Sequence, residues 1–198
     1  MLSMKFLSSF LTIAIITCNI FAGSLTGVVN YDGKPMPKIK KTQLNKLTDD
    51  PECGSKHKTP IYRQSLIVNE NKTLKNTLVY LKDIKYDGEV TKEPALLDQA
   101  GCLYSPHVMG VMANQPVTIR NSDAKILHNV HTLPKINKER NLAMPLVMDI
   151  STTFEKSESP FVVKCDVHPW MKAYVAVFDH PYFAVTDDTG NFKIENIP

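Results

Sequence analysis

The sequence predicts an all-β fold, an antiparallel β-sandwich. Many short apolar or alternating stretches run along the chain, and turns rich in Pro, Gly, Asn and Asp separate them. No amphipathic pattern is long enough for a helix of three turns. Short strands joined by such turns are typical of two packed layers of sheet.

The bulk composition is that of an ordinary globular domain. The chain has 198 residues, 43% apolar and 22% charged, which is enough for one domain with a hydrophobic core. The formal net charge is only +3, and no long basic run occurs, so a nucleic-acid partner is not expected.

Residues 1–22 have the pattern of a secretory signal peptide. Lys5 precedes a short apolar run, and small residues follow near Ala22. The run is too short for a spanning helix, so no transmembrane span is expected after signal removal. We therefore expect an exported protein of the periplasm or cell envelope. An alternative is a lipoprotein anchored at Cys18, for which Ile15-Ile16-Thr17 is a poor lipobox.

The rest of the chain divides into three parts. Residues 23–98 are expected to form an N-terminal β extension with strands at 24–31, 65–68 and 77–81 and a lysine-rich solvated loop at 34–47. Residues 99–181 form the expected core, with strands at 117–121, 161–164 and 172–178. Residues 182–198 read as a C-terminal hairpin around the turn 187–190. The stop at Pro198 suggests a truncated fragment.

Three metal-ligating side chains lie within seven residues. Cys165, His168 and Met171 offer a thiolate, an imidazole and a thioether on one short loop between consecutive strands, which should pair antiparallel. His128 offers a second imidazole. Two imidazoles, one thiolate and a weak axial thioether are the ligand set of a mononuclear blue-copper site, so we expect copper. Zinc also binds Cys and His, but the Met ligand favours copper.

Two other histidines compete for roles. His131 lies three residues after His128 and could replace it as the ligand, although His128 is favoured. His107 follows Cys102 by five residues and is either part of an accessory site or an ordinary loop histidine.

Neighbouring residues are expected to support the site. Asn129 could hydrogen-bond to the loop that bears Cys165 and so tie the two ligand segments together. Pro169 and Trp170 would stiffen the loop and shield the metal. The ring edge of His168, late on an exposed loop, is the expected electron port.

Export leaves three cysteines in an oxidising compartment. The simplest arrangement commits Cys165 to the metal and joins Cys53 to Cys102 in a disulfide. The alternative is that Cys53 or Cys102 is a buried free thiol.

The two ligand motifs resemble those of the cupredoxins. The stretch 165–171 looks like the ligand loop of amicyanin-like and plastocyanin-like type 1 copper proteins, Cys-x-x-His-Pro-Phe-Met, and residues 128–131 resemble their first histidine segment. This likeness implies a Greek-key sandwich and supports His128 over His131. Residues 50–53 and 102–108 are similar to segments of methylamine-utilisation-type exported plastocyanin-like proteins.

The length of residues 24–98 departs from a small cupredoxin. The final hairpin looks like the start of a carboxypeptidase-regulatory-like segment, which such proteins can carry. The expected function is electron transfer with a redox partner protein of unknown identity. The alternatives are copper chaperoning or storage without electron transfer, and an envelope β-sandwich that binds carbohydrate or protein. No enzymatic activity is expected, because no second histidine cluster for a further copper centre is found.

Overall fold

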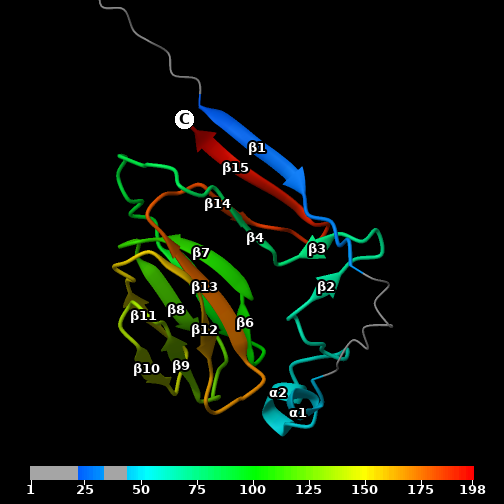
Figure 1. The fold of residues 1–198 in the computed structure, drawn as a ribbon. Coiled ribbons are helices and arrows are strands. Elements are labelled where there is room, and N and C mark those ends of the chain that lie inside the picture. Colours follow the sequence, from blue (N-terminus) through cyan, green and yellow to red (C-terminus); the bar gives the residue numbers. More distant parts are fainter. Residues whose placement is uncertain (1–21, 34–43) are drawn as a thin grey trace, which may run out of the picture.

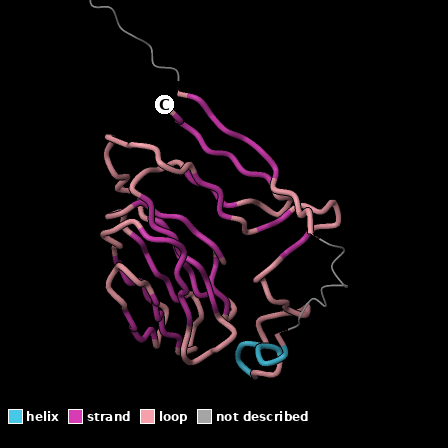
Figure 2. The backbone as a smooth tube through the Cα atoms, in the orientation of Figure 1, coloured by secondary structure: helices cyan, strands magenta, loops and turns pink. Residues whose placement is uncertain are grey.

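The computed structural model describes residues 22–33 and 44–198 (Figure 1). The expected signal peptide lies outside the described residues except for its last position, and so does most of the expected loop at 34–47. Strands and loops make up almost all of the described chain, as the backbone trace shows (Figure 2). Among these residues, no helix is long and apolar enough to cross a bilayer.

Two sheets form the predicted sandwich. The first has five strands in the order β10-β9-β12-β13-β7, and the second has four in the order β11-β8-β5-β6. The strands of the first sheet are β7 (Val108–Met112), β9 (His128–Leu133), β10 (Arg140–Met144), β12 (Glu158–Lys164) and β13 (Lys172–Phe178). Those of the second sheet are β5 (Ala95–Ala100), β6 (Leu103–Ser105), β8 (Val117–Asn121) and β11 (Met148–Thr152).

Strand pairing confirms the sandwich but is not wholly antiparallel. β12 and β13 pair antiparallel, as expected for the strands that flank residues 165–171. However, β13 pairs with β7 in parallel, and so does β5 with β8. In both cases the chain leaves the sheet between the two strands, which frees the second strand to return in either direction. The sandwich also begins at Ala95, within the expected extension.

The hydrophobic core lies between the two sheets. Alternate residues of β8 and β13 point inward, among them Val117, Ile119, Ala173 and Val175, which are all buried in one cluster. This period of two follows from strand geometry, because successive side chains point to opposite faces. The expected strands at 117–121 and 172–178 match β8 and β13 at both ends.

The extension forms small strand pairs outside the sandwich. They involve β1 (Gly23–Val28), β2 (Ile67–Val68), β3 (Leu74–Lys75), β4 (Leu78–Tyr80), β14 (Phe183–Val185) and β15 (Asn191–Ile197). β1 pairs with β15, β4 with β14 and β2 with β3. Figure 1 shows the β1–β15 pair at one end of the molecule. The Phe183 ring packs directly over Gly110 of β7, where a β-carbon would collide with it.

The expected C-terminal hairpin is therefore wrong in its pairing. Strands and turn are present, and the Asp187 N–H donates to the Asn191 carbonyl at 2.9 Å. However, β14 and β15 each pair with a strand from the extension instead of with each other. The turn sequence carries no information about strands far away in the chain. Here such strands form the backbone hydrogen bonds that the two arms of a hairpin would otherwise make with each other.

Two short helices follow β1 in the chain, and the first begins inside the loop expected at residues 34–47. They are α1 (Asn45–Thr48) and α2 (Pro51–Gly54). Asp50 caps α2 by accepting the backbone N–H groups of Glu52 and Cys53, and Pro51 stands at the first helical position. A disulfide joins Cys53 of α2 to Cys102, which confirms the expected disulfide, and Cys165 is free and buried. It attaches the α1–α2 segment to the sandwich.

Candidate metal centre

Three of the four expected ligands converge in the interior at one end of the five-stranded sheet. The Nδ1 atoms of His128 and His168 lie 3.0 Å apart, and the Sγ atom of Cys165 lies 3.8 Å from Nδ1 of His168. One ligand atom from each residue lies within 4.8 Å of the other two. The exposed fractions are 0% for His128, 1% for Cys165 and 7% for His168.

The loop after β12 folds back on itself. The backbone N–H of His168 points at Sγ of Cys165 at 3.4 Å, and the N–H of Met171 donates to the His168 carbonyl at 2.9 Å. The N–H of Cys165 donates to the Met171 carbonyl at 3.3 Å. Met171, the fourth expected ligand, is fully buried at the end of this turn. The spacing of Cys165, His168 and Met171 thus corresponds to one loop that is closed by backbone hydrogen bonds.

His128 is held by a carboxylate that sequence reasoning missed. Its Nε2 atom lies 2.9 Å from Oδ2 of Asp123, which leaves Nδ1 facing the centre. His128 is the first residue of β9. The only signal for Asp123 was its position five residues before the histidine.

Asp123 is itself fixed by a tight turn. Gly101 and Cys102 link β5 to β6 with positive φ angles of 60° and 55°, the pattern of a two-residue type I′ hairpin turn. Their backbone N–H groups donate to Asp123 at 2.8 and 2.7 Å, and the Lys56 ammonium lies 3.1 Å away. Burial alone would raise the pKa of Asp123, but the hydrogen bonds from His128 and these donors lower it strongly.

Hydrogen bonds and nearby charges also shift the pKa values of the expected ligands His128 and Cys165. Burial lowers the pKa of His128, but the hydrogen bond to Asp123 and the proximity of Cys165 outweigh it and raise the pKa. Burial raises the pKa of the Cys165 thiol, but hydrogen bonds from His128 and from backbone N–H groups outweigh it and lower the pKa. The environment therefore favours the thiolate, the form that binds metal.

Asn129 ties the two ligand segments together, as the sequence predicts. Its Oδ1 atom accepts the backbone N–H of Asp166 at 2.7 Å and lies 3.3 Å from Sγ of Cys165, which donates to it as a thiol. Its Nδ2 group donates to Asn141 and Asp166. The strand bearing His128 and the loop bearing Cys165 are thereby fixed at the position of the ligands.

Tyr104 makes a second link between these strands. Its hydroxyl lies 2.9 Å from the Asn129 carbonyl and 3.1 Å from the Lys164 carbonyl, and it can donate to either. Burial, followed by the nearby charges of Cys165 and Asp166, raises the pKa of this phenol far above its usual range. Tyr104 therefore stays protonated and keeps its role as a donor.

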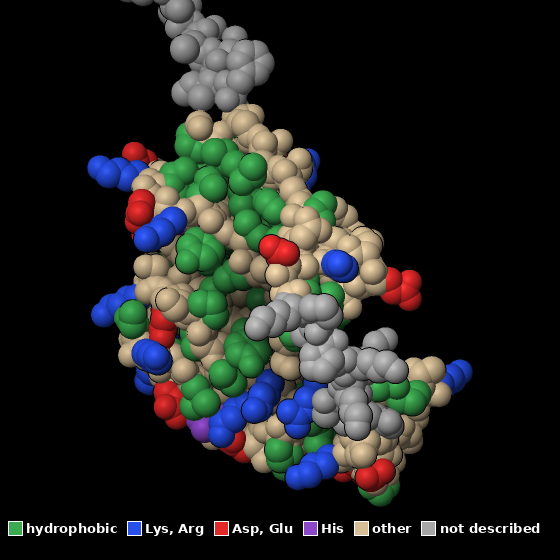
Figure 3. All heavy atoms as spheres, turned by 45° about the vertical axis from the view of Figure 1, so that its right-hand side comes forward, with side chains coloured by type: hydrophobic (Ala, Val, Ile, Leu, Met, Phe, Trp, Pro, Cys, Tyr) green, Lys and Arg blue, Asp and Glu red, His purple; other side chains and the backbone are tan. Residues whose placement is uncertain are grey.

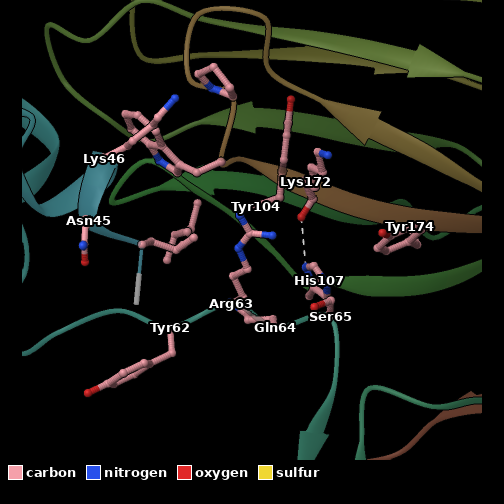
Figure 4. Close-up of a pocket in the computed structure, with 14 residues that line it drawn as sticks. Asn45, Lys46, Tyr62, Arg63, Gln64, Ser65, Tyr104, His107, Lys172 and Tyr174 are labelled. Atoms are coloured by element: carbon pink, nitrogen blue, oxygen red, sulfur yellow. Dashed lines mark hydrogen bonds between the residues drawn. The ribbon is translucent and has the colours of Figure 1, made fainter. Parts of the chain in front are cut away.

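His131 does not face the centre. Its Nδ1 atom lies 2.7 Å from Asp166 and its Nε2 atom 2.9 Å from Glu139 on the outer side of β9. Residues 128 and 130 point inward along the strand, so residue 131 must point outward. His107 is also separate, because its Nδ1 atom donates to the Lys172 carbonyl at 2.9 Å and it lines a different cavity (Figure 4).

The ring of His168 is not the exposed edge that the sequence suggested. Both sulfur atoms of the Cys53–Cys102 disulfide lie within 4.8 Å of a His168 ring nitrogen. The Trp170 ring centroid lies 5.1 Å from that of His168, and the Trp170 Nε1–H donates to the Cys102 carbonyl at 3.0 Å. The α1–α2 segment thus covers the imidazole. Burial and the neighbouring charge of His128 lower the pKa of His168.

The donor set fits one soft or borderline metal ion. Two imidazole nitrogens and one thiol sulfur, all buried, match the ligand preferences of copper. The two other ligand groups within the described residues, Cys53–Cys102–His168 and Cys102–Asp123–His128, both include a sulfur committed to the disulfide.

Comparisons with known proteins give partial structural similarities. No protein-family model matches the chain, and no curated protein matches it. A variant of amicyanin in its reduced Cu(I) form is 26% identical over 45% of this chain and 86% of its own length, with a TM-score of 0.39. A purple cupredoxin from Nitrosopumilus maritimus is 21% identical, covering 42% of this chain and 98% of its own, with a TM-score of 0.36. A copper-containing nitrite reductase from Thermus scotoductus SA-01 is 17% identical over 49% of this chain and 25% of its own, with a TM-score of 0.38.

Proposed function

We propose that this protein is an exported type 1 copper protein that transfers electrons and catalyses no reaction of its own. His128, Cys165 and His168 would hold the metal, with Met171 as a weak axial ligand. The observation that supports this proposal most directly is the convergence of two Nδ1 atoms and one Sγ atom, each within 4.8 Å of the others, in a buried site. Localisation to the periplasm or cell envelope rests on the signal-peptide pattern of residues 1–22.

Copper bound by such a set exchanges one electron between Cu(I) and Cu(II). The protein's part is to keep the ligands in one arrangement for both oxidation states. Asn129 fixes the distance between the two ligand segments, Asp123 orients His128, and the closed loop positions Cys165. A preorganised, buried ligand set limits movement when the charge changes, which is what rapid electron transfer requires.

A hydrogen-bond donor at the sulfur also supports the electron-transfer role. The backbone N–H of His168 points at Sγ of Cys165, and this contact suits the thiolate form of the sulfur. Polar contacts at a copper-bound thiolate tune the reduction potential. A carrier needs such tuning, whereas a store needs only affinity.

Optical and EPR spectra with one equivalent of Cu(II) test the proposal. We expect an intense visible thiolate-to-copper band and narrow copper hyperfine splitting in the wild type. Cys165→Ser should abolish the band, because the charge-transfer donor is removed. His131→Asn is the matched control and should keep it, since His131 lies on the outer side of β9.

The alternatives give different results. A chaperone or store would bind Cu(I) without a stable Cu(II) band and would pass copper to a chelator without cycling electrons. Copper binding with no thiolate band in the wild type would contradict the type 1 assignment. An envelope-binding sandwich would then become the leading interpretation.

A further inference from the structure

A cavity of about 440 Å³ lies between the α1–α2 segment and the sandwich. Its walls come from residues 44–46 and 62–65 on one side and from β6, β13 and the ligand loop on the other (Figure 4). Asn45 and Lys46 of α1 line it, so the segment that contains α1 and α2 forms part of the first wall. The cavity is large enough for several side chains or a small ligand.

The charged residues around the cavity are all positive. Lys46, Arg63 and Lys172 line it, and none of its 14 lining residues is Asp or Glu. Within the described residues, no ion pair joins any of these three cations to a carboxylate. Figure 3 shows several Lys and Arg side chains on the lower half of one face of the molecule, with Asp and Glu side chains also present there. Cations that form no ion pair within the protein favour the binding of an anionic ligand or partner.

The cavity also reaches the ligand loop. Pro169 and Trp170 form part of its wall, and the Trp170 ring lies 5.1 Å, centroid to centroid, from the ring of His168. His168 itself is covered by the disulfide and by Trp170. A partner seated in the cavity would thus lie one aromatic side chain from a metal ligand.

We infer that this cavity is the docking site for carboxylate side chains of an acidic redox partner, and that electrons pass across its Trp170 wall. This inference rests on the proposed function. Three unpaired cations would attract an acidic segment and orient it. Leu103, Tyr62 and Tyr174 add apolar and aromatic surface against which the stems of Asp and Glu side chains can pack. The cavity-lining residues include neither Asp50, the N-cap residue of α2, nor Glu52 of α2, so an acidic partner in the cavity would not lie directly against these two carboxylates.

The first test detects the anion site without copper. Paramagnetic hexacyanochromate(III) is titrated into the copper-free protein while backbone amide NMR signals are recorded. We expect selective broadening around Lys46, Arg63 and Lys172. The triple variant Lys46→Gln, Arg63→Gln, Lys172→Gln should lose that broadening. A control with the same loss of charge, Lys85→Gln, Lys92→Gln, Lys138→Gln, should keep it. Uniform weak broadening in the wild type would overturn the inference.

The second test asks whether electrons use this site. Stopped-flow measurements follow oxidation of the Cu(I) protein by ferricyanide, in which one electron passes to Fe(III) and gives Cu(II) and ferrocyanide. At low salt the cavity variant should react roughly 10-fold more slowly than the control variant, because electrostatic steering is lost. The difference should shrink at about 1 M salt, where charges are screened beyond roughly 3 Å. With the cationic oxidant tris(phenanthroline)cobalt(III), the cavity variant should not be slowed.

The two tests separate the possible failures. Selective broadening with equal ferricyanide rates in the cavity and control variants would identify a site for a free anion and overturn the electron-transfer role. Absence of the thiolate-to-copper band would overturn the proposed function and the docking inference with it, whatever the NMR result shows about anion binding.

Discussion

Asp123 Oδ2 and His128 Nε2 lie 2.9 Å apart in the protein interior, at the junction of the metal site, the β5–β6 turn and the disulfide. This contact directs the other ring nitrogen of His128 toward Cys165 and His168. It also links one expected ligand to Lys56, which follows the α2 turn. The segment that covers the site is therefore joined to His128 through the Lys56–Asp123 ion pair and to the β5–β6 turn through the disulfide.

The Asp123→Asn variant should bind copper about 10- to 100-fold more weakly, because a carboxylate that orients a metal-bound histidine contributes to affinity in this range. Competition with a Cu(I) chelator measures the effect. Asp149→Asn is the control, since Asp149 is half exposed and pairs with Arg120 on the surface. Equal affinities in both variants would show that His128 needs no orienting partner.

Removal of the disulfide in Cys53→Ser, Cys102→Ser should lower the free energy of unfolding by about 4 kcal/mol on a chain-entropy estimate for its sequence separation of 49 residues. Denaturant unfolding of the copper-free protein measures this. Wild type under reducing conditions should behave like the variant. A loss below about 1 kcal/mol would mean that the α1–α2 segment stays attached by its other contacts.

Tyr104→Phe should lower the free energy of unfolding by about 1–3 kcal/mol, because the one buried hydroxyl donor shared by the Asn129 and Lys164 carbonyls is lost. Tyr80→Phe, at a half-exposed ring, should change it by less than about 0.5 kcal/mol. Urea unfolding of both variants gives the comparison. We also expect the thiolate-to-copper band to shift in Tyr104→Phe, since the hydroxyl links the strands that bear His128 and Cys165.

Glu158 should make stability depend on pH. Burial raises the pKa of this carboxyl, but hydrogen bonds from Asn137 and from the backbone N–H groups of residues 135–137 lower it below the ordinary value. A lowered folded-state pKa stabilises the protein above the unfolded pKa of about 4.3, and this contribution is lost as pH falls.

The Glu158→Gln variant should therefore be less stable than wild type at pH 7, and the difference should narrow as pH drops below about 4. Urea unfolding across this pH range measures it. Glu155→Gln, at an exposed neighbouring position, should follow the wild-type curve. If the free energies of unfolding of wild type and Glu158→Gln differed by the same amount at all pH values, the side chain of Glu158 would stabilise the loop at residues 135–137 by its shape and not by its charge.

Much of the site could be predicted because its chemistry is local. Cys165, His168 and Met171 lie on one loop whose length sets their spacing, and the strands on either side are short alternating segments. His128 and Asn129 were identified because residue type and order within a short motif are visible in one sequence. The period of two along β9 then decides between His128 and His131.

The parts that sequence reasoning missed depend on contacts between distant segments. Asp123 becomes a partner of His128 only because the β5–β6 turn presents two N–H groups to the carboxylate that lies beside that histidine. β14 and β15 do not form a hairpin because β14 pairs with β4 and β15 pairs with β1. Neither fact leaves a periodic or compositional signal.

The sequence by itself determined the all-β class and the spacing of the candidate ligand residues, because strand alternation and loop length are properties of neighbouring positions. Only the tertiary structure decided that His168 is buried, that the Cys53–Cys102 disulfide lies beside it, and that a cationic cavity adjoins Trp170. Burial and cavity shape arise from which surfaces meet when distant strands pack. That packing is chosen by the total free energy of the folded chain and not by any single stretch of it.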